Sequence, residues 1–282
     1  MYNAISAEWT KLLPHRGTWM LVWLYPLALL AILIIGIFVA AAGKTPDGAA
    51  TAAGWINQTA IVWHVPTIAF GRYLIAAYFA LVFAGEYGWN TWKLVVPHSA
   101  RWKLIAAKYA VPALLLYLAW FAGAAITVAM NLLEAAVLGK ALPGGITAAA
   151  ILASHFSLLV EGIAPLLLTA VYASMAAVLT RSTLAAFIIS LVLITLDQAF
   201  GKLAQLLSAY GMEWLSLPYR ILPGYHLQNL ASWLHEGVGY QARFAGGTIV
   251  AYSQTVSLLM LAAWIAGLAA LTFATFRRQD IN

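Results

Sequence analysis

"WMLVWLYPLALLAILIIGIFVAAA", residues 19–42, decides the class of this protein. The run holds no charged side chain, and about 20 apolar residues in a helix are enough to cross ~30 Å of hydrocarbon. Of all 282 residues, 63% are hydrophobic and only 9% are charged, whereas soluble domains carry about 25% charged residues. A soluble fold of this length could not bury so much apolar surface. We therefore predict an all-α membrane protein.

Five more apolar runs are long enough to span a membrane, which makes six spans in one membrane domain covering residues 1–282. The five runs are about 66–85, 104–130, 147–179, 184–207 and 254–276. The runs at 104–130 and 147–179 exceed the length that a bilayer needs, so we expect them to tilt or to project beyond it. Pro112 and Pro165 are expected to kink these two helices. The first run is longer than the 7–15 apolar residues of a signal peptide, so we expect it to be retained.

The basic residues predict the orientation of the spans. With the N-terminus in the cytoplasm, nine lysines and arginines fall in inside segments and five in outside segments. Cytoplasmic loops carry the excess of Lys and Arg, so both termini are expected in the cytoplasm. The net charge of +6 is then a topology signal. Because the cations are scattered over short loops, we expect no nucleic-acid partner.

Residues 1–18, before the first span, show helical periodicity. Apolar side chains fall near one face: Ile5, Trp9, Leu12 and Leu13. Charged and polar side chains fall off that face: Glu8, Lys11 and His15. This pattern predicts an amphipathic helix lying on the inner leaflet of the membrane. An ordinary lead-in to the first span is the alternative.

The segment between the last two spans, residues 208–253, is long and rich in tyrosine and tryptophan. Such residues are enriched at the headgroup layer of a membrane. Patches such as "LQNLASWL" (227–234) suggest short helices lying on the outer face. The segment is expected to anchor the protein in that layer, and the alternative is a lid over a ligand.

Polar and ionisable residues inside the spans are costly, so each suggests a function or a buried partner. The candidates for a substrate path are Arg72, Asn131, His155, Glu161 and Asp197. Pairing between helices, for instance of Arg72 with Asp197, is the structural alternative.

The sequence carries no pattern of a catalytic or metal site. "AGKT" (42–45) lacks the first glycine of a phosphate-binding loop, and "HEGVG" (235–239) lacks the second histidine of a zinc-protease helix. There are no cysteines, and no triad or paired carboxylates have the necessary spacing. We therefore expect a chain without catalysis, metal or cofactor of its own.

"GEYGWNTWKLVVPHSARWKL", residues 85–104, interrupts the apolar pattern between the second and third spans. Trp89, Trp92 and Val96 recur at helical spacing, and Pro97 would stop that helix. The segment predicts a short helix outside the lipid with aromatic side chains of the kind that anchor protein interfaces. A basic hairpin at the headgroups is the alternative.

The same segment resembles the permease subunits of type-2 ABC exporters, and most closely the small six-span permeases of the bacitracin-resistance type. The resemblance rests on a Glu that closes the second span, a Thr, a basic residue with an apolar neighbour, and a Pro/Ser/Arg turn into the third span. The matching residues are Glu86, Thr91, Lys93, Leu94, Pro97, Ser99 and Arg101. Asn90 stands where glycine is usual, and Ala100 is inserted before Arg101.

The resemblance implies that residues 86–103 form a cytoplasmic coupling helix seated on a separate ATPase subunit. The coupling residues would be Glu86, Trp89, Thr91, Trp92, Lys93, Pro97 and Arg101. It also implies two copies of the ATPase, which carries the ATP and Mg, and a dimer of permease chains in the bacterial cytoplasmic membrane. The cargo would be an amphipathic, lipid-like, peptide or drug molecule. The alternative function is a proton-coupled secondary transporter that uses Glu161 and Asp197.

Overall fold

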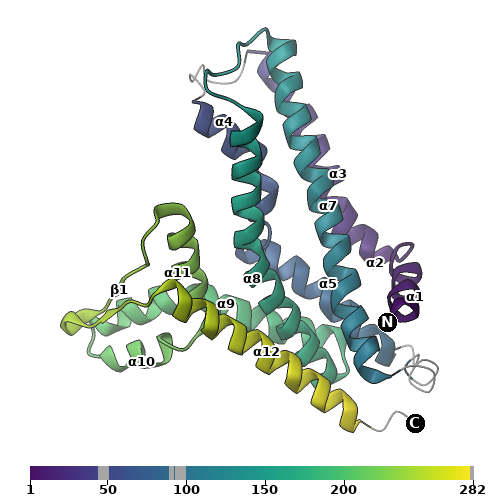
Figure 1. The fold of residues 1–282 in the computed structure, drawn as a ribbon, viewed down its shortest axis with the longest axis vertical. Coiled ribbons are helices and arrows are strands. Elements are labelled where there is room, and N and C mark those ends of the chain that lie inside the picture. The colour runs from purple at the N-terminus through teal and green to yellow at the C-terminus, as the bar shows by residue number, and fades with distance from the viewer. Residues whose placement is uncertain (44–50, 89–91, 93–99, 280–282) are drawn as a thin grey trace. The chain divides into compact units, whose positions relative to one another are not determined.

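The computed structural model describes residues 1–43, 51–88, 92 and 100–279, and most of them are helical (Figure 1). Six helices are long and apolar enough to cross a membrane, as the sequence predicts. They are Arg16–Ala41, Ala69–Gly88, Arg101–Leu138, Ala148–Thr180, Thr183–Ser208 and Gln254–Arg278. This confirms the class of a multi-pass helical membrane protein.

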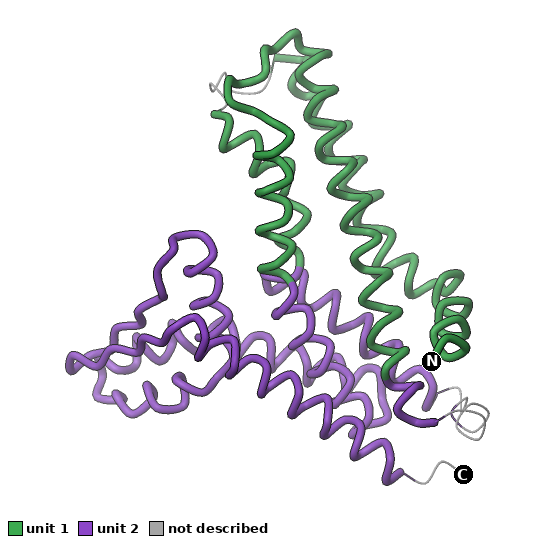
Figure 2. The backbone as a smooth tube through the Cα atoms, in the orientation of Figure 1, with its two compact units in different colours: residues 1–65, 106–162 green, residues 66–105, 163–282 purple. Residues whose placement is uncertain are grey.

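The described chain divides into two compact units, and both are built from spans (Figure 2). Unit 1 holds residues 1–65 and 106–162, and unit 2 holds residues 66–105 and 163–282. Helices α7 (Arg101–Leu138) and α8 (Ala148–Thr180) contribute to both units and continue through Pro112 and Pro165. Their 38 and 33 residues correspond to about 57 and 50 Å, so the expectation of over-long helices is confirmed.

Unit 1 begins with α1 (Tyr2–Leu12), α2 (Arg16–Thr18), the π-helical turn η1 (Trp19–Trp23) and α3 (Leu24–Ala41). Pro26 has no N–H to donate to the turn before it, and the chain widens to a π-helix at that point. The first span is therefore helical from Arg16 onward, with one irregular turn.

The buried face of α1 differs from the expected one. The helix buries Ala4, Glu8 and Leu12, and Lys108 Nζ of α7 lies 3.0 Å from a carboxylate oxygen of Glu8. Glu8 had been assigned to the outward face because of its charge. The ion pair reverses that assignment, since a buried carboxylate needs a partner and Lys108 supplies one.

The segment after α3 also contains structure that the sequence analysis did not predict. It forms α4 (Ala52–Thr59) and the 3-10 turn η2 (Ile61–His64), which pack on α7 within unit 1. A Cβ atom on Gly123 of α7 would lie 2.8 Å from a methyl group of Val62, so only glycine permits this close approach. The rings of Trp63 and Phe121 meet edge to face at 5.1 Å.

Unit 2 contains α5 (Ala69–Gly88), α9 (Thr183–Ser208) and α12 (Gln254–Arg278). Between α9 and α12 the chain forms a small subdomain of short elements (Figure 1). These are η4 (Glu213–Leu215), α10 (Ser216–Tyr219), α11 (Pro223–Glu236), β1 (Ala242–Arg243), η5 (Ala245–Gly247) and β2 (Ile249–Val250). The antiparallel pair β1–β2 is a small departure from an all-α fold.

The subdomain has its own hydrophobic core. Several of the aromatic residues that were expected in the headgroup layer belong to this core. Tyr219, Tyr225 and Phe244 are buried together, with Leu215 and Val250 beside them. Tyr225 donates its hydroxyl to the carbonyl of Tyr240 and accepts from the N–H of Tyr252. Part of the aromatic content therefore holds the subdomain together, while other aromatic residues such as Tyr210 and Trp214 are exposed.

Candidate coupling site and polar clusters

The segment that resembles a coupling helix begins inside α5, because that helix continues to Gly88. Glu86 is buried in the last turn of α5, beside Tyr87. Of the other predicted coupling residues, Trp92 and Arg101 are described. Four lie outside the described residues: Trp89, Thr91, Lys93 and Pro97.

Trp92 points into its own chain. Its ring lies 4.5 Å from the ring of Phe276 in α12 and 5.9 Å from that of Tyr87, and the residue is 2% exposed. The expectation that Trp92 presents an outward aromatic surface is therefore corrected. An indole buries more apolar area against two neighbouring aromatic rings than it would at an aqueous surface.

Arg101, the first residue of α7, holds the end of α12. Its guanidinium donates to the carbonyls of Phe276 at 2.9 Å, Arg277 at 2.6 Å and Gln279 at 3.1 Å. The last carbonyls of a helix have no intrahelical donor and carry partial negative charge. Arg101 satisfies them with a cation, which stabilises the end of α12.

Gln279 ties the same end of α12 to α5 and α8. Its side-chain oxygen accepts from the Tyr87 hydroxyl at 2.6 Å, and its amide nitrogen donates to the Val178 carbonyl at 2.8 Å. We call this set of residues the α12 clasp: Tyr87, Trp92, Arg101, Phe276 and Gln279. Sequence reasoning found Trp92 and Arg101 but missed Phe276 and Gln279, because no local pattern at the end of α12 marks them.

Arg181 lies in the tight turn between α8 and α9 and is the only non-glycine residue with a positive φ in the described chain, at 54°. Its guanidinium lies 5.9 Å from the centre of the Tyr87 ring. The next residue, Ser182, caps α9 by accepting from the N–H of Ala185. The strained backbone of this turn thus brings a cation against the clasp.

The outward aromatic residue near the clasp is Trp102. It is 53% exposed at the start of α7, and the ammonium of Lys103 lies 5.8 Å from its ring. The sequence analysis did not select it, because it lies after the turn and outside the predicted short helix.

Arg72 and Asp197 form an ion pair in unit 2, as the structural alternative predicted. Arg72 Nη2 lies 2.9 Å from Asp197 Oδ2, and the two side chains are 1% and 5% exposed. Thr169 accepts from Arg72 Nε at 2.9 Å, and the Tyr172 hydroxyl donates to Asp197 Oδ1 at 3.2 Å. Asp197 is therefore buried among protein groups, as this pairing requires.

His155 belongs to a separate cluster in unit 1. The indole N–H of Trp63 donates to His155 Nδ1 at 3.0 Å, so His155 carries its proton on Nε2, which lies 3.3 Å from the Thr59 hydroxyl oxygen. Asn131 donates to the carbonyl of Thr127 one turn earlier at 2.8 Å, and the Thr127 hydroxyl donates to the Thr59 carbonyl. Their polar groups hold α4, α7 and α8 together.

The predicted substrate path is thus divided between the two units. Arg72 and Asp197 are in unit 2, whereas Asn131, His155 and the half-buried Glu161 are in unit 1. Arg72 and Asp197 pair within unit 2, and Asn131 and His155 form hydrogen bonds within unit 1. A role for these residues in transport stays a prediction.

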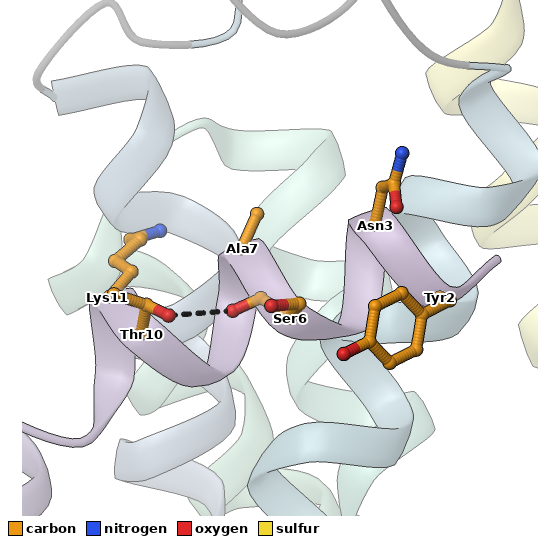
Figure 3. A pocket seen from close by; sticks show the side chains of 6 residues that line it. All are labelled: Tyr2, Asn3, Ser6, Ala7, Thr10 and Lys11. Atoms are coloured by element: carbon orange, nitrogen blue, oxygen red, sulfur yellow. Dashed lines mark hydrogen bonds between the residues drawn. The ribbon is translucent and has the colours of Figure 1, made fainter.

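A hollow of about 540 Å³ lies along the outward side of α1 (Figure 3). Its lining residues are Tyr2, Asn3, Ser6, Ala7, Thr10 and Lys11. They supply hydroxyls, an amide and one cation, with no carboxylate or histidine. Across the described ranges, no three His, Asp or Glu side chains come together in a way that could hold a metal ion.

No family model matches the chain, and no curated protein matches its sequence.

Proposed function

We propose that this chain is the membrane-spanning permease subunit of an ATP-driven ABC transporter that exports an amphipathic molecule of lipid-like, peptide or drug class. The observation that carries the proposal is the α12 clasp. A segment too short and too polar to span joins α5 to α7, and Trp92 and Arg101 tie it to the end of α12. Movement imposed on this segment would reach three spans at once.

The mechanism in this proposal needs a stiff connection between the ATPase and the spans. ATP binding closes two ATPase subunits beneath a permease dimer, and that closure displaces residues 86–103. The buried contact of Trp92 with Phe276 and the three carbonyl contacts of Arg101 connect these two residues to the end of α12. In this proposal, a displacement of Trp92 and Arg101 moves the end of α12 with them.

Because Trp92 is buried within its own chain, other side chains would contact the ATPase in this proposal. Trp102, with Lys103 beside it, offers an exposed aromatic surface at the start of α7, and exposed Trp residues often dominate protein interfaces. Trp92 then acts as a positioning residue. In this proposal residues 86–103 and both termini are cytoplasmic, ATP and Mg belong to the partner, and the permease is a homodimer in the bacterial cytoplasmic membrane.

The competing proposal is proton-coupled secondary transport. The half-buried position of Glu161 inside α8 favours it, because an ionisable group in a span often marks a proton path. The pairing of Asp197 with Arg72 opposes it, since that carboxylate is already held by a guanidinium and a tyrosine hydroxyl.

Co-expression with a candidate ABC ATPase subunit from the same genome tests the proposal. We expect the two proteins to co-purify in mild detergent and the ATPase to hydrolyse ATP faster in proteoliposomes when this chain is present. A matched pair of variants, Trp102→Ala and the distant Trp233→Ala, separates docking from general damage. Independence of the ATPase activity from this chain, together with transport driven by a proton gradient, would favour the competing proposal.

A further inference from the structure

The imidazole of His155 is hydrogen-bonded at both nitrogens to one short segment, α4 with η2. The indole N–H of Trp63 donates to its Nδ1 at 3.0 Å, and its Nε2 lies 3.3 Å from the Thr59 hydroxyl oxygen. The Thr59 hydroxyl donates its own proton to the carbonyl of Ile56 at 2.7 Å. Thr59 therefore accepts from Nε2, while Trp63 can only donate to Nδ1. These contacts fit a neutral ring with its single proton on Nε2.

Protonation of Nδ1 would oppose this arrangement. A charged imidazole carries an N–H on both nitrogens, so the new N–H would point at the indole N–H of Trp63. Trp63 is 2% exposed, and a buried donor that loses its acceptor is costly. The repulsion is relieved when Trp63 leaves this position, because water then accepts from the indole.

Helix α4 and the turn η2 depend on docking for their structure. They contain 8 and 4 residues, and isolated helices of fewer than about 12 residues are marginal in water. The segment buries Trp55, Ile56, Val62 and Trp63. Of these, Trp63 carries the bond to His155 and also packs on the ring of Phe121 in α7. Displacement of Trp63 therefore weakens the docking of the whole segment.

The cluster lies at one face of the membrane. His155 precedes Thr180, the last residue of α8, by 25 residues, which is about 37 Å along the helix. Thr127, which donates to the Thr59 carbonyl, follows Arg101, the first residue of α7, by 26 residues, which is about 39 Å. A typical tilt of ~20° leaves about 35 Å, which exceeds the ~30 Å of hydrocarbon. Both helices thus place the cluster where water can supply protons.

We propose that His155 is a pH sensor at the outer face of the membrane, and that its protonation releases α4 and η2 from α7 and α8. Histidine is the side chain whose charge ordinarily changes between pH 5 and pH 8, and His155 is only half-buried. The inference does not rest on the proposed transport function. Assignment of this face to the outside rests on the excess of Lys and Arg in the inside segments.

Three other titratable groups lie on the same elements: His64 in η2, Glu134 in α7 and Glu161 in α8. Glu134 is three residues beyond Asn131, and Glu161 is six residues beyond His155, which is about 9 Å along α8. A carboxylate near the ring would favour its charged form. The bonds from Trp63 and to Thr59 favour the neutral form, so these three groups are controlled for in the test.

Pairs of spin labels measure the docking directly, because the chain has no cysteine of its own. Gln58→Cys on α4 and Leu152→Cys on α8 are exposed positions, and each would carry a nitroxide. The distance between the labels is measured by pulsed electron paramagnetic resonance at pH 7.5 and pH 5, in full-length protein in detergent. The pair Leu133→Cys and Leu152→Cys joins the exposed sides of α7 and α8 and reports whether these two helices stay in place.

We expect a single narrow distance between positions 58 and 152 at pH 7.5 and a second, longer distance at pH 5. The ratio of undocked to docked protein should rise by about tenfold or more, which corresponds to 1.4 kcal/mol per decade. His155→Gln should keep α4 docked at both pH values, because its amide can accept from Trp63 and donate to Thr59 without titrating. The matched control His64→Gln should respond to pH as the wild type does.

An unchanged distance between positions 58 and 152 in the wild type at pH 5 would overturn the inference. An undiminished pH response in His155→Gln would also overturn it and would assign the effect to another titratable group. If His155→Gln disturbs the distance between positions 133 and 152, Trp63→Phe is the second test, because it removes the N–H that opposes a charged ring. Trp63→Phe should then show a smaller change between the two pH values than the wild type, and an equal change would contradict the inference.

Discussion

Arg101 and Phe276 are joined twice: the guanidinium donates to the Phe276 carbonyl at 2.9 Å and lies 5.7 Å from the centre of its ring. The first residue of one span thus caps the end of another that is 175 residues away in the sequence. A charged donor on the carbonyls at a helix end contributes about 1.5–3 kcal/mol. Arg101 therefore stabilises the end of α12 together with the contacts of Gln279.

Replacing Arg101 by Ala should loosen the end of α12. The carbonyls of Phe276, Arg277 and Gln279 lose their shared donor, so amide exchange over 274–279 should accelerate by about tenfold or more, at 1.4 kcal/mol per decade. Arg101→Lys should recover part of the protection, because one ammonium cannot reproduce the forked geometry. Hydrogen exchange in detergent measures this, with Lys140→Ala as a control. Unchanged exchange in Arg101→Ala would show that the cap contributes nothing.

Replacing Trp92 by Ala should destabilise the protein before it affects docking of a partner. The ring is buried against Phe276 and Tyr87, and a buried Trp→Ala change costs about 3–5 kcal/mol. Trp92→Phe should cost less. The thermal midpoint in detergent should fall clearly for Trp92→Ala and little for the exposed Trp102→Ala. A lost ATPase interaction with an unchanged midpoint would instead identify Trp92 as a docking residue.

Asp197→Ala should be more harmful than removal of the whole Arg72–Asp197 pair. The single change leaves a buried guanidinium without its carboxylate, which costs about 3–5 kcal/mol. Combining Arg72→Met with Asp197→Leu removes both charges and should recover much of the stability. Thermal unfolding of the three variants measures the difference. Transport activity in the stable double variant would exclude Asp197 as a proton carrier, and its complete loss would support that role.

The subdomain between α9 and α12 should weaken in acid because of His226. Burial lowers the pKa of His226 below its ordinary value of 6.5, and its bond to the Arg220 carbonyl offsets this only partly. Its Nδ1 accepts from Ser257, which also accepts from Asn229. Below pH ~6.5, His226 binds a proton more readily when the subdomain is unfolded than when it is folded. The stability of the subdomain is therefore present at neutral pH and is lost as the pH falls.

Limited proteolysis of α11 at pH 7.5 and pH 5 measures this effect. Cleavage should increase at the lower pH in the wild type and in the control His235→Gln, whose side chain is exposed. His226→Gln, which cannot titrate, should remove the pH dependence. An undiminished pH dependence in His226→Gln would assign the effect to another group.

Cysteine labelling should place positions 102 and 236 on opposite sides of the membrane. Trp102→Cys should react with an impermeant maleimide only in inside-out vesicles, and Glu236→Cys only in right-side-out cells, since the inside segments carry the excess of Lys and Arg. Labelling of position 102 from outside would contradict both the topology and the coupling role.

The six spans could be predicted from the sequence, because length and apolarity are local properties. Their limits were less accurate, since the run predicted at 104–130 is the helix Arg101–Leu138. The run predicted at 184–207 is the helix Thr183–Ser208, and that at 254–276 is Gln254–Arg278. A bilayer accepts any helix of about 20 apolar residues, whatever its neighbours are. The pairing of Arg72 with Asp197 could also be predicted from the sequence. An ionised side chain in hydrocarbon needs a partner, and the spans contain few ionisable residues.

Only the tertiary structure decided which way particular side chains point. Glu8 was placed outward by its charge and is buried because Lys108, 100 residues away, supplies its counter-ion. Trp92 was expected to face a partner and packs on Phe276 instead. The chain after Ser208 folds back because Gly201 and Gly224 permit close contacts with Tyr219 and with the backbone of α9. Local pattern specifies an element, but the surface that each face meets depends on distant residues, and their proximity exists only in the folded chain.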